Sequence, residues 1–355
     1  MNTTDLKSMS LEELSEEMKR LGEKPFKAKQ LYEWMHKKHA SSYDEMSNLS
    51  KELRRKLNES YPYVCLQAVQ VQTSKLDGTQ KYLFELPDGN VIESVLMRYH
   101  HGNSVCISSQ VGCRMGCRFC ASTIGGLVRN LAPSEMLEQI YRITALTGER
   151  VSNVVVMGTG EPMDNYDNIV KFIRMLSNEK GLNISQRNIT VSTCGIVPRM
   201  QQLAEEGLQI TLAISLHASN DEKRRALMPI AYKYSIREVL DACRNYFKKT
   251  GRRMTFEYSL VGGSNDSDGD AAELAGLLKG LNCHVNLIPV NPIEERDYVQ
   301  PDKNVIENFR KKLEKYGINV TIRREMGRDI DGACGQLRKR YVSRGDGQGK
   351  GEVET

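Results

Sequence analysis

Residues 106–120 read CISSQVGCRMGCRFC, and the interpretation of the whole chain starts from this stretch. Within it, Cys113, Cys117 and Cys120 follow the spacing Cys-x3-Cys-x2-Cys, which places three thiols within eight residues. A glycine precedes both Cys113 and Cys117, and glycine permits the tight backbone turns that would let the thiols converge. Clustered cysteine thiolates of this kind are typical ligands of iron–sulfur clusters. The stretch therefore predicts a loop that holds a metal cluster.

The number of cysteines in this loop narrows the choice of metal. A [4Fe-4S] cluster has four irons, so three thiolates leave one iron open to a substrate or cofactor. A structural zinc site is the main alternative, but it commonly uses two Cys-x2-Cys pairs, and no second pair occurs in the sequence. Three buried cysteines without a chemical role are the remaining alternative. The spacing favours an iron–sulfur cluster with one open iron.

Length and composition indicate a cytoplasmic protein with a substantial core. The chain has 355 residues, of which 39% are apolar, enough for one large or two ordinary domains. The N-terminal residues lack the apolar stretch of a signal peptide, and no run approaches the roughly 18 apolar residues of a membrane span. Nine cysteines in the cytoplasm should be reduced, which favours metal or redox roles over structural disulfides.

The net charge is only +5, but the basic residues are unevenly spread. Residues 222–253 contain ten Lys or Arg against three Asp or Glu, a local balance of +7. Both this stretch and a second basic set near the C-terminus suit contacts to phosphates, although a solvated helix face explains the first stretch equally well. A nucleic acid partner is therefore expected. The second set consists of Arg323, Arg324, Arg328, Arg338, Lys339 and Arg340.

The order of hydrophobic patterns predicts four regions. Residues 1–62 carry apolar residues at helical spacing and predict a small helical accessory domain. Residues 63–98 alternate with period two and predict a β-hairpin set that leads into the cluster loop. Residues 99–340 alternate between strand and helix patterns, about six strand–helix units and a last strand, so an α/β fold of parallel strands is expected, as an open sheet or a partial barrel. Residues 341–355 are polar and glycine-rich and predict a disordered tail.

Polar residues follow several of the predicted parallel strands. In such folds the ligand site lies at the carboxyl ends of the strands, so these residues are expected to meet there. Each one alone could be an ordinary strand terminus, but their repetition at successive strand ends indicates a ligand site. They are Gly160 and Glu161, Ser192, the run Ser215-Leu216-His217, and Asn291.

The segment DIDGACGQL, residues 329–337, follows the last predicted strand. Small residues flank Cys334 and would leave its sulfur accessible. A structural cysteine would more naturally lie within an apolar run, so the pattern favours a chemical role for Cys334.

Taken in order, CISSQVGCRMGCRFC, MGTGEP, SLH, VNLIPVNP and DIDGACGQL resemble the motifs of the RlmN family, dual-specificity RNA methyltransferases of the radical S-adenosylmethionine (SAM) superfamily. The resemblance runs from the N-terminal helices to Arg340. The Cfr family, which modifies the other adenine carbon, shares much of the pattern, but Cfr proteins tend to carry Arg at Pro289 and GEA at residues 160–162. Gly332 departs from the alanine that is usual in the RlmN family.

The resemblance implies a partial (β/α)6 barrel of the radical SAM type, with the helical accessory domain and the linking β-hairpin set. It implies a [4Fe-4S] cluster on Cys113, Cys117 and Cys120, and two SAM molecules per turnover, one as methyl donor and one as radical source. It also implies an external electron donor such as a flavodoxin or ferredoxin, and a cytoplasmic monomer. The implied SAM contacts are Gly160, Glu161, Ser192, Ser215, Leu216, His217 and Asn291.

The implied reaction is methylation of adenine C2, in 23S rRNA at the peptidyl-transferase centre and in some tRNAs at the adenosine 3′ of the anticodon. C2 is electron-poor, so a carbon radical suits it better than polar methyl transfer. In the family's scheme Cys334 accepts a methyl group and carries it to C2, Cys106 resolves the resulting adduct through a disulfide with Cys334, and Glu93 acts as base. Three alternatives remain open: methylation at C8, a non-catalytic iron–sulfur protein that binds RNA, and a radical enzyme with another substrate.

Overall fold

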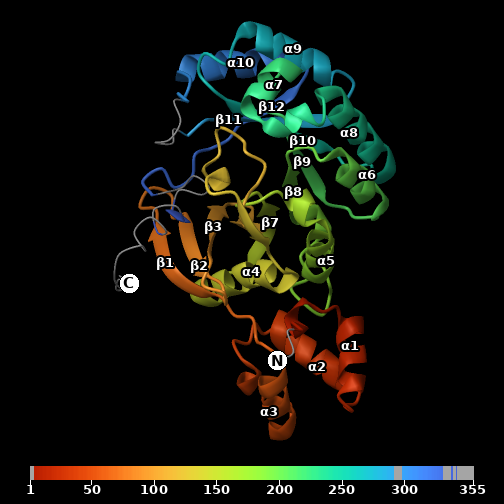
Figure 1. The fold of residues 1–355 in the computed structure, drawn as a ribbon. Coiled ribbons are helices and arrows are strands. Elements are labelled where there is room, and N and C mark those ends of the chain that lie inside the picture. Colours follow the sequence, from red (N-terminus) through yellow and green to blue (C-terminus); the bar gives the residue numbers. More distant parts are fainter. Residues whose placement is uncertain (1–3, 292–297, 331–336, 339–340, 342–355) are drawn as a thin grey trace.

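The computed structural model describes residues 4–291, 298–330, 337–338 and 341 (Figure 1). Cys334 and the tail predicted for residues 341–355, apart from Tyr341, therefore lie outside the described residues. Within the described part, no helix is long and apolar enough to cross a membrane.

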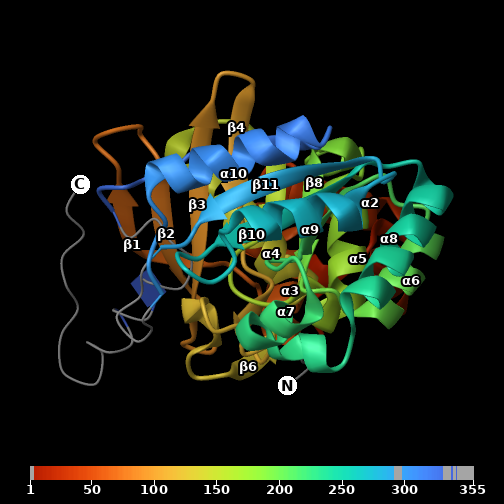
Figure 2. The same ribbon diagram turned by 90° about the horizontal axis from the view of Figure 1, so that it is seen from above.

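One curved sheet of ten strands forms the centre of the molecule, and it wraps partly around the site (Figures 1 and 2). Strands β4 to β12 of this sheet run parallel, whereas β1, β2 and β3 extend one edge as an antiparallel set. In sheet order, the strands are β1 (Gln67–Thr73), β2 (Gln80–Glu85), β3 (Val91–Tyr99), β4 (Gly102–Cys106), β7 (Val151–Val156), β8 (Ile189–Thr193), β9 (Thr211–Ser215), β10 (Met254–Leu260), β11 (Cys283–Pro289) and β12 (Asn319–Ile322).

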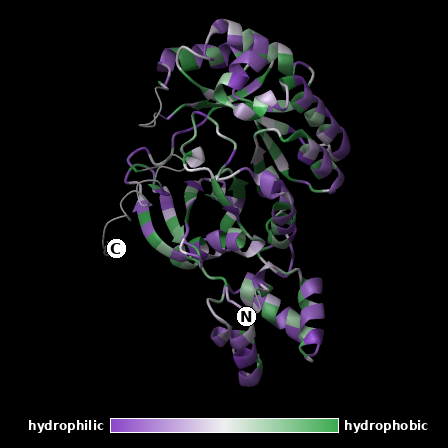
Figure 3. Cartoon of the chain, in the orientation of Figure 1, coloured by the Kyte–Doolittle hydropathy of each residue, from purple (hydrophilic) through white to green (hydrophobic). Residues whose placement is uncertain are grey.

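A helical connection follows each parallel strand before the next one, which confirms the six strand–helix units and final strand expected from the sequence. These helices cover the outer face of the sheet, and their polar sides face outward (Figure 3). Together with the curvature of the sheet, this arrangement confirms the partial-barrel fold. The helices are α4 (Pro133–Thr147), α5 (Tyr166–Leu176), α6 (Val197–Glu205), α7 (Asp221–Leu227), α8 (Ile236–Thr250), α9 (Asp268–Leu278) and α10 (Lys303–Lys315).

Helix α8 illustrates why these segments are helical. Ser235 caps its first turn in a capping box with Glu238, and Gly251 ends the helix in the left-handed conformation that glycine adopts without strain. Its apolar residues recur at helical spacing, so one face is buried against the sheet. The buried residues are Ile236, Val239, Leu240, Ala242, Cys243 and Tyr246.

The accessory region lies at the end of the molecule away from α9 and α10 (Figure 1). It contacts α4 through buried polar pairs: Lys7 Nζ lies 2.8 Å from Glu138 Oε1, and His36 Nδ1 lies 2.8 Å from the Tyr141 hydroxyl. Its helices are η1 (Leu6–Ser8), α1 (Leu11–Arg20), α2 (Phe26–His36), η2 (Tyr43–Glu45) and α3 (Lys51–Ser60).

The β-hairpin set is continuous with the barrel sheet. Strand β3 pairs antiparallel with β4, and Val95 lies opposite Cys106 in the register. The sequence predicted a linking region here, whereas the strands form one wall of the same sheet. Glu93 and Cys106 are therefore brought to neighbouring strands.

Candidate active site

The loop that carries the three cysteines is fixed by a small two-stranded sheet of β5 (Gln110–Gly112) and β6 (Leu127–Asn130). Gly112 has a positive φ of 75°, and a Cβ atom there would lie 2.0 Å from the carbonyl oxygen of Gly126. Cys113 N donates a hydrogen bond to that same oxygen at 2.9 Å. Only glycine fits at this position, so the residue before the first cysteine is required by the path of the loop.

Further hydrogen bonds hold the second half of the cluster loop. The hydroxyl of Thr123 donates to the carbonyl oxygens of Cys117 at 3.2 Å and Cys120 at 2.9 Å. The backbone N–H of Arg118 donates to Leu227 O at 2.9 Å, which ties the loop to the end of α7. The loop is therefore shaped by the protein itself.

The three thiols fit an iron–sulfur cluster. Burial raises the pKa of Cys113 to about 12 and also raises the pKa values of Cys117 and Cys120, and the thiols of Cys113 and Cys117 are further affected by their cysteine neighbours. Buried, mutually interacting thiols ionise readily only beside a strong positive charge, which iron supplies. No group of three or more described His, Cys, Asp or Glu side chains converges as for a single metal ion. In a [4Fe-4S] cluster each thiolate binds a different iron, so convergence on one point is not required.

A cavity of about 260 Å³ lies at the carboxyl ends of the parallel strands, against the cluster loop. It is lined by all three cluster cysteines and by most of the residues expected to bind SAM. The exception is Leu216, which is fully buried and whose N–H donates to Glu257 O at 3.1 Å. The predicted residues that line the cavity are Cys113, Cys117, Cys120, Gly160, Glu161, Ser192, Ser215, His217 and Asn291.

The glycines of the MGTGEP motif let two chain segments approach closely behind this cavity. A Cβ atom at Gly158 would lie 2.6 Å from Ile107 O. At Gly160, with a φ of 115°, it would lie 2.7 Å from the Cβ atom of Gln110. Both glycines are therefore required where the end of β7 packs against the segment that follows β4.

Glu161 is buried, and its carboxylate is oriented by two backbone N–H groups. Its Oε1 accepts a hydrogen bond from Met163 at 3.0 Å, and its Oε2 accepts one from Cys194 at 2.8 Å. Burial raises the pKa of this carboxyl, and these hydrogen bonds oppose the shift. Glu161 therefore joins the ends of β7 and β8, and its remaining acceptor capacity lies at the cavity wall. A contact to a ligand ammonium there stays a prediction.

His217 holds an unusual backbone conformation, with a φ of 56°. Its Nδ1 accepts a hydrogen bond from Ser259 N at 2.9 Å, so the neutral ring carries its hydrogen on Nε2. Burial lowers the pKa of His217 to about 3, which keeps the ring uncharged at neutral pH. Backbone conformations of this kind are retained where surrounding contacts enforce them, often at functional sites.

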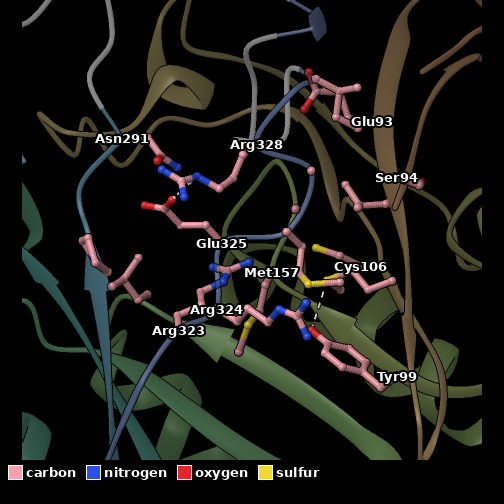
Figure 4. A pocket seen from close by; sticks show the side chains of 18 of the residues that line it. Glu93, Ser94, Tyr99, Cys106, Met157, Asn291, Arg323, Arg324, Glu325 and Arg328 are labelled. Atoms are coloured by element: carbon pink, nitrogen blue, oxygen red, sulfur yellow. Dashed lines mark hydrogen bonds and ion pairs between the residues drawn. The ribbon is translucent and has the colours of Figure 1, made fainter. Parts of the chain in front are cut away.

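A second cavity, of about 380 Å³, adjoins the first (Figure 4). Cys106 and Glu93 line it from β4 and β3, and exposed arginines enter it from the segment after β12. Burial raises the pKa of the Cys106 thiol, whereas the positive charges of Arg323 and Lys81 act in the opposite direction. The two cavities share the residues Met157, Gly158, Ile288, Pro289, Asn291 and Arg323.

Glu93 is only 3% exposed. Lys81 Nζ lies 3.1 Å from its Oε2, and Arg338 N donates to its Oε1 at 2.6 Å. A carboxylate in a strand of alternating pattern is more often exposed. Burial is possible here because the positive charge of Lys81 lies beside it.

The two basic sets that suited phosphate contacts in the sequence lie in different parts of the structure. Arg224 is fully buried and donates to the carbonyl oxygens of Cys194, Leu216 and Tyr234, at 2.7, 3.3 and 3.2 Å. The interpretation of Arg224 as a phosphate contact is therefore wrong.

Other basic residues of the first set are also paired with an acidic residue or lie away from the site. Lys223 pairs with Asp270 at 2.7 Å. Lys248 and Lys249 end the helix that leads into β10, so they lie at the opposite edge of the sheet from the site. In contrast, Arg323, Arg324 and Arg328 of the second set line the second cavity.

Three polar residues that line the cavity beside the cluster loop were not singled out from the sequence. Glu257 lines the cavity from β10, and its Oε2 accepts a hydrogen bond from Asn286 Nδ2 at 2.8 Å. Burial raises the pKa of Glu257. A carboxylate inside the apolar run FEYSL was the available signal for it. Ser259 and Thr123 complete this group.

Comparisons with known proteins agree with this geometry. Residues 107–275 match the Radical SAM superfamily, and residues 4–62 match the ribosomal RNA large subunit methyltransferase N-terminal domain. Two relatives carry the name "Probable dual-specificity RNA methyltransferase RlmN". The one from Lachnospira eligens is 69% identical, covering 96% of this chain and 97% of its own length. The one from Lachnoclostridium phytofermentans is 65% identical, with 96% of both chains covered.

A solved structure shows the same architecture. The crystal structure of a radical SAM methyltransferase from Sphaerobacter thermophilus superposes with a TM-score of 0.90 and is 44% identical. The match covers 94% of this chain and 98% of that one. Since fold, cluster loop and near full-length relatives agree, the chain belongs to the RlmN family of radical SAM methyltransferases.

Proposed function

We propose that this enzyme methylates C2 of an adenosine at the peptidyl-transferase centre of 23S rRNA and of the adenosine 3′ of the anticodon in some tRNAs. One observation carries the proposal. The cavity beside the cluster loop shares six lining residues with a second cavity, which presents Cys106, Glu93 and exposed arginines (Figure 4). A cofactor site and a site for a polyanionic substrate therefore share a wall.

The cofactors are a [4Fe-4S] cluster and SAM, as in the radical SAM superfamily. Bound at Cys113, Cys117 and Cys120, the cluster supplies the electron that cleaves SAM to a carbon radical. Glu161 and the Gly160 backbone would receive the amino end of SAM. Ser192 and Ser215, whose hydroxyl oxygens lie 3.3 Å apart, would face its remaining polar groups, with His217 and Asn291.

The second cavity suits an unstacked adenosine. Arg323 and Arg324 are exposed at this cavity, and the charge of Arg323 also opposes the rise in the pKa of Glu257 that burial causes. Their guanidinium groups would contact the phosphates beside the target base. An enzyme that acts on a ring atom must take the base out of its stack, which favours adenosines in loops.

Cys106 and Glu93 have complementary tasks in releasing the product. After the methylene radical of Cys334 has added to C2, the adduct loses one electron, which an oxidised flavodoxin or ferredoxin would accept, and Glu93 accepts the C2 proton, so the ring regains its aromatic form. The Cys106 thiolate then attacks the sulfur of Cys334, and a disulfide forms as the carbon–sulfur bond breaks. The electron pair of that bond passes to the methylene carbon, which takes up a proton and becomes the methyl group.

The position of Pro289 supports C2 over C8 as the target. Pro289 lines both cavities, at the point where base and cofactor meet. It is one of the residues at which the chain differs from the Cfr pattern. Methylating RNA in vitro, digesting it and locating the new methyl carbon by NMR tests this assignment. A signal at C8 would overturn it, and a failure to form any 5′-deoxyadenosine under anaerobic reducing conditions would favour a protein that only binds RNA.

We also propose that the enzyme works as a cytoplasmic monomer reduced by an external flavodoxin or ferredoxin. Each reductive cleavage of SAM consumes one electron, which an outside carrier must supply to the cluster. Light scattering of the cluster-containing protein should give the mass of one chain. Reduced flavodoxin should support SAM cleavage when no chemical reductant is present, and the absence of cleavage with either carrier would contradict the proposal.

A further inference from the structure

The chain at the end of α7 lies against the cluster loop (Figures 1 and 2). Arg118 N donates a hydrogen bond to Leu227 O at 2.9 Å, and a Cβ atom at Gly116 would lie 3.3 Å from Pro229 Cγ. Cys117 lies between these two loop residues and packs in one apolar cluster with Leu227. The segment that follows α7 therefore covers a part of the loop that carries a cluster ligand.

This region combines exposed cations with an exposed aromatic side chain. Arg118, Arg225 and Lys233 are exposed, and none of the three forms an ion pair with a described residue. The 3₁₀ helix η6 (Pro229–Tyr232) follows α7 after one residue, and its last residue, Tyr232, is 75% exposed. We call Arg118, Arg225, Tyr232 and Lys233 the α7–η6 face. Tyr and Arg are enriched at protein–protein interfaces, so this composition suits a protein partner.

The α7–η6 face lies at the protein surface nearest to a buried cluster ligand. Cys113 and Cys117 are buried, and Cys120 is partly buried, so an electron carrier in solution must approach them through the residues that cover them. Gly116 and Arg118, on either side of Cys117, are exposed. Because electron transfer weakens steeply with distance, a carrier that docks against these residues has a short path to the cluster.

The unpaired cations of this face differ from their paired neighbours. Arg114 of the same loop forms an ion pair with Asp164, and Lys223 of α7 forms one with Asp270 at 2.7 Å. Glu222 is an exposed acidic residue of α7, so the three cations of the α7–η6 face still outnumber it. A partner with an acidic surface is complementary to this charge, which speeds its encounter with the enzyme.

RNA is the other polyanion that the proposed function brings to the enzyme, but its expected position is different. None of the four described residues of the α7–η6 face lines either cavity. The second cavity, with Cys106 and the exposed Arg324, is where the target base is expected. An electron carrier needs access to the cluster and not to the base, so the position of the face favours a carrier over RNA.

We propose that the α7–η6 face is the docking surface for an acidic one-electron carrier protein of the flavodoxin or ferredoxin type. The inference rests on the proposed function, which requires such a carrier. In the transfer the reduced carrier loses one electron and the cluster gains it, and no bond forms or breaks. The residues of the face contact the carrier and not SAM or RNA.

Charge reversal on the face provides the test. Arg225→Glu and Lys233→Glu change exposed side chains outside the cluster loop, whereas Arg118 lies between two cluster ligands and is left unchanged. Lys248→Glu is the matched control. Lys248 is an exposed residue of the same basic set, but it ends α8, at the opposite edge of the sheet from the cluster loop.

The measurement uses the full-length, cluster-containing enzyme and a purified flavodoxin of negative net charge, and it is repeated with a ferredoxin. Isothermal titration calorimetry at several salt concentrations gives the affinity for the oxidised carrier, and anaerobic stopped-flow absorbance gives the rate of cluster reduction by the reduced carrier. At low salt, Arg225→Glu and Lys233→Glu should each weaken carrier binding by about tenfold and slow reduction, whereas Lys248→Glu should match the wild type. The wild-type affinity should fall as salt rises.

Three further measurements separate docking from folding. Iron content and SAM cleavage with dithionite report whether the cluster of each variant is intact, and fluorescence anisotropy reports RNA affinity. Arg225→Gln and Lys233→Gln remove each charge without reversing it, so they should shift carrier affinity in the same direction by a smaller factor. They decide the matter if a charge-reversed variant loses iron.

The outcomes are distinguishable. Equal carrier affinity in the wild type and in the variants at Arg225 and Lys233 would overturn the docking surface and leave the proposed function standing. Weaker RNA binding with unchanged carrier affinity would assign this face to RNA and also overturn the proposal. An equal loss in Lys248→Glu would show that only total charge matters.

The wild type supplies the remaining outcome. If neither carrier binds it or reduces its cluster, while dithionite supports RNA methylation, the docking surface and the external carrier of the proposed function both fail. The methylation of adenosine would then stand without them.

Discussion

The two adjoining cavities differ in the charge that they present. The cavity beside the cluster loop contains buried carboxylates, Glu161 and Glu257, and a neutral imidazole, His217. The second cavity presents the exposed Arg324 and Arg328, whereas Arg323 lines both cavities. Buried, uncharged or hydrogen-bonded groups hold a small ligand away from water, whereas exposed arginines attract a polyanion from solution. The difference indicates that radical formation and RNA binding use separate surfaces that meet at one wall.

The largest expected effect comes from disabling one cavity alone. Cys117→Ala removes a cluster ligand, so we expect loss of the cluster's iron and of all methylation. RNA affinity should stay unchanged, because Arg324 and Arg328 line only the other cavity. Iron analysis, a methylation assay and RNA binding by fluorescence anisotropy check this prediction. A variant that loses RNA binding together with iron would show that the two cavities are not independent.

Glu93 variants test the chemistry of the second cavity, which Glu93 lines. Glu93→Gln keeps an oxygen that can accept the Arg338 N–H but removes the base, so methylation should slow by about 10² to 10⁴-fold. The thiol–disulfide equilibrium between Cys106 and Cys334 should be preserved in this variant. Glu93→Ala removes both functions and should also disturb that equilibrium.

Rates of methylation and glutathione titrations of the two Glu93 variants provide the comparison. If Glu93→Gln methylates RNA at the wild-type rate, Glu93 is only an attachment point for the chain after Cys334.

The positive charge of the second cavity should make RNA affinity depend on salt concentration. Arg323→Gln and Arg324→Gln should each weaken RNA binding and reduce the slope of log affinity against log salt by about 0.7 to 0.9. Arg225→Gln is the control, because Arg225 is an exposed member of the other basic set. Binding titrations at several salt concentrations measure the slopes. The assignment fails if Arg225→Gln reduces the slope and the two cavity variants do not.

The smallest expected effect is on the free energy of unfolding at acidic pH, to which His217 of the cavity beside the cluster loop contributes. Burial lowers the pKa of His217 to about 3, so the unfolded chain binds a proton below about pH 6.5 that the folded protein does not. The stability from keeping this ring neutral is present above pH 6.5 and is lost as pH falls toward 3. The loss is up to about 1.4 kcal/mol per pH unit.

His217→Asn should therefore flatten the pH dependence of unfolding, while its side-chain oxygen can still accept the Ser259 N–H. Urea unfolding at pH 7.0 and 5.5 compares the variant with the wild type. An identical pH dependence in both proteins would mean that His217 is protonated inside the fold.

Spacing made much of this site predictable from sequence. The three cysteines, the glycines of MGTGEP and the polar residues at strand ends are local signals, and the regular alternation of strands and helices brings them to one edge. The six strand–helix units were predictable for the same reason.

Other features depend on contacts between distant segments. In the sequence, Arg224 resembles its neighbours in a basic run. In the structure it is buried and donates hydrogen bonds to three carbonyl groups from separate segments. The Lys81–Glu93 pair and the bond from Ser74 to Asp329 depend on how the hairpin set meets the chain after β12. No periodic pattern in the sequence indicates such pairings.

Trapping the covalent intermediate tests the central claim most directly, since the adenosine must lie in the second cavity, which Cys106 lines. Cys106→Ala, supplied with SAM, reductant and tRNA, should accumulate a protein–RNA adduct joining Cys334 to adenine C2 through one methylene carbon. The wild type should release methylated RNA instead, and Cys334→Ala should form no adduct. Release of methylated RNA by Cys106→Ala at the wild-type rate, or an adduct at another residue, would contradict the account.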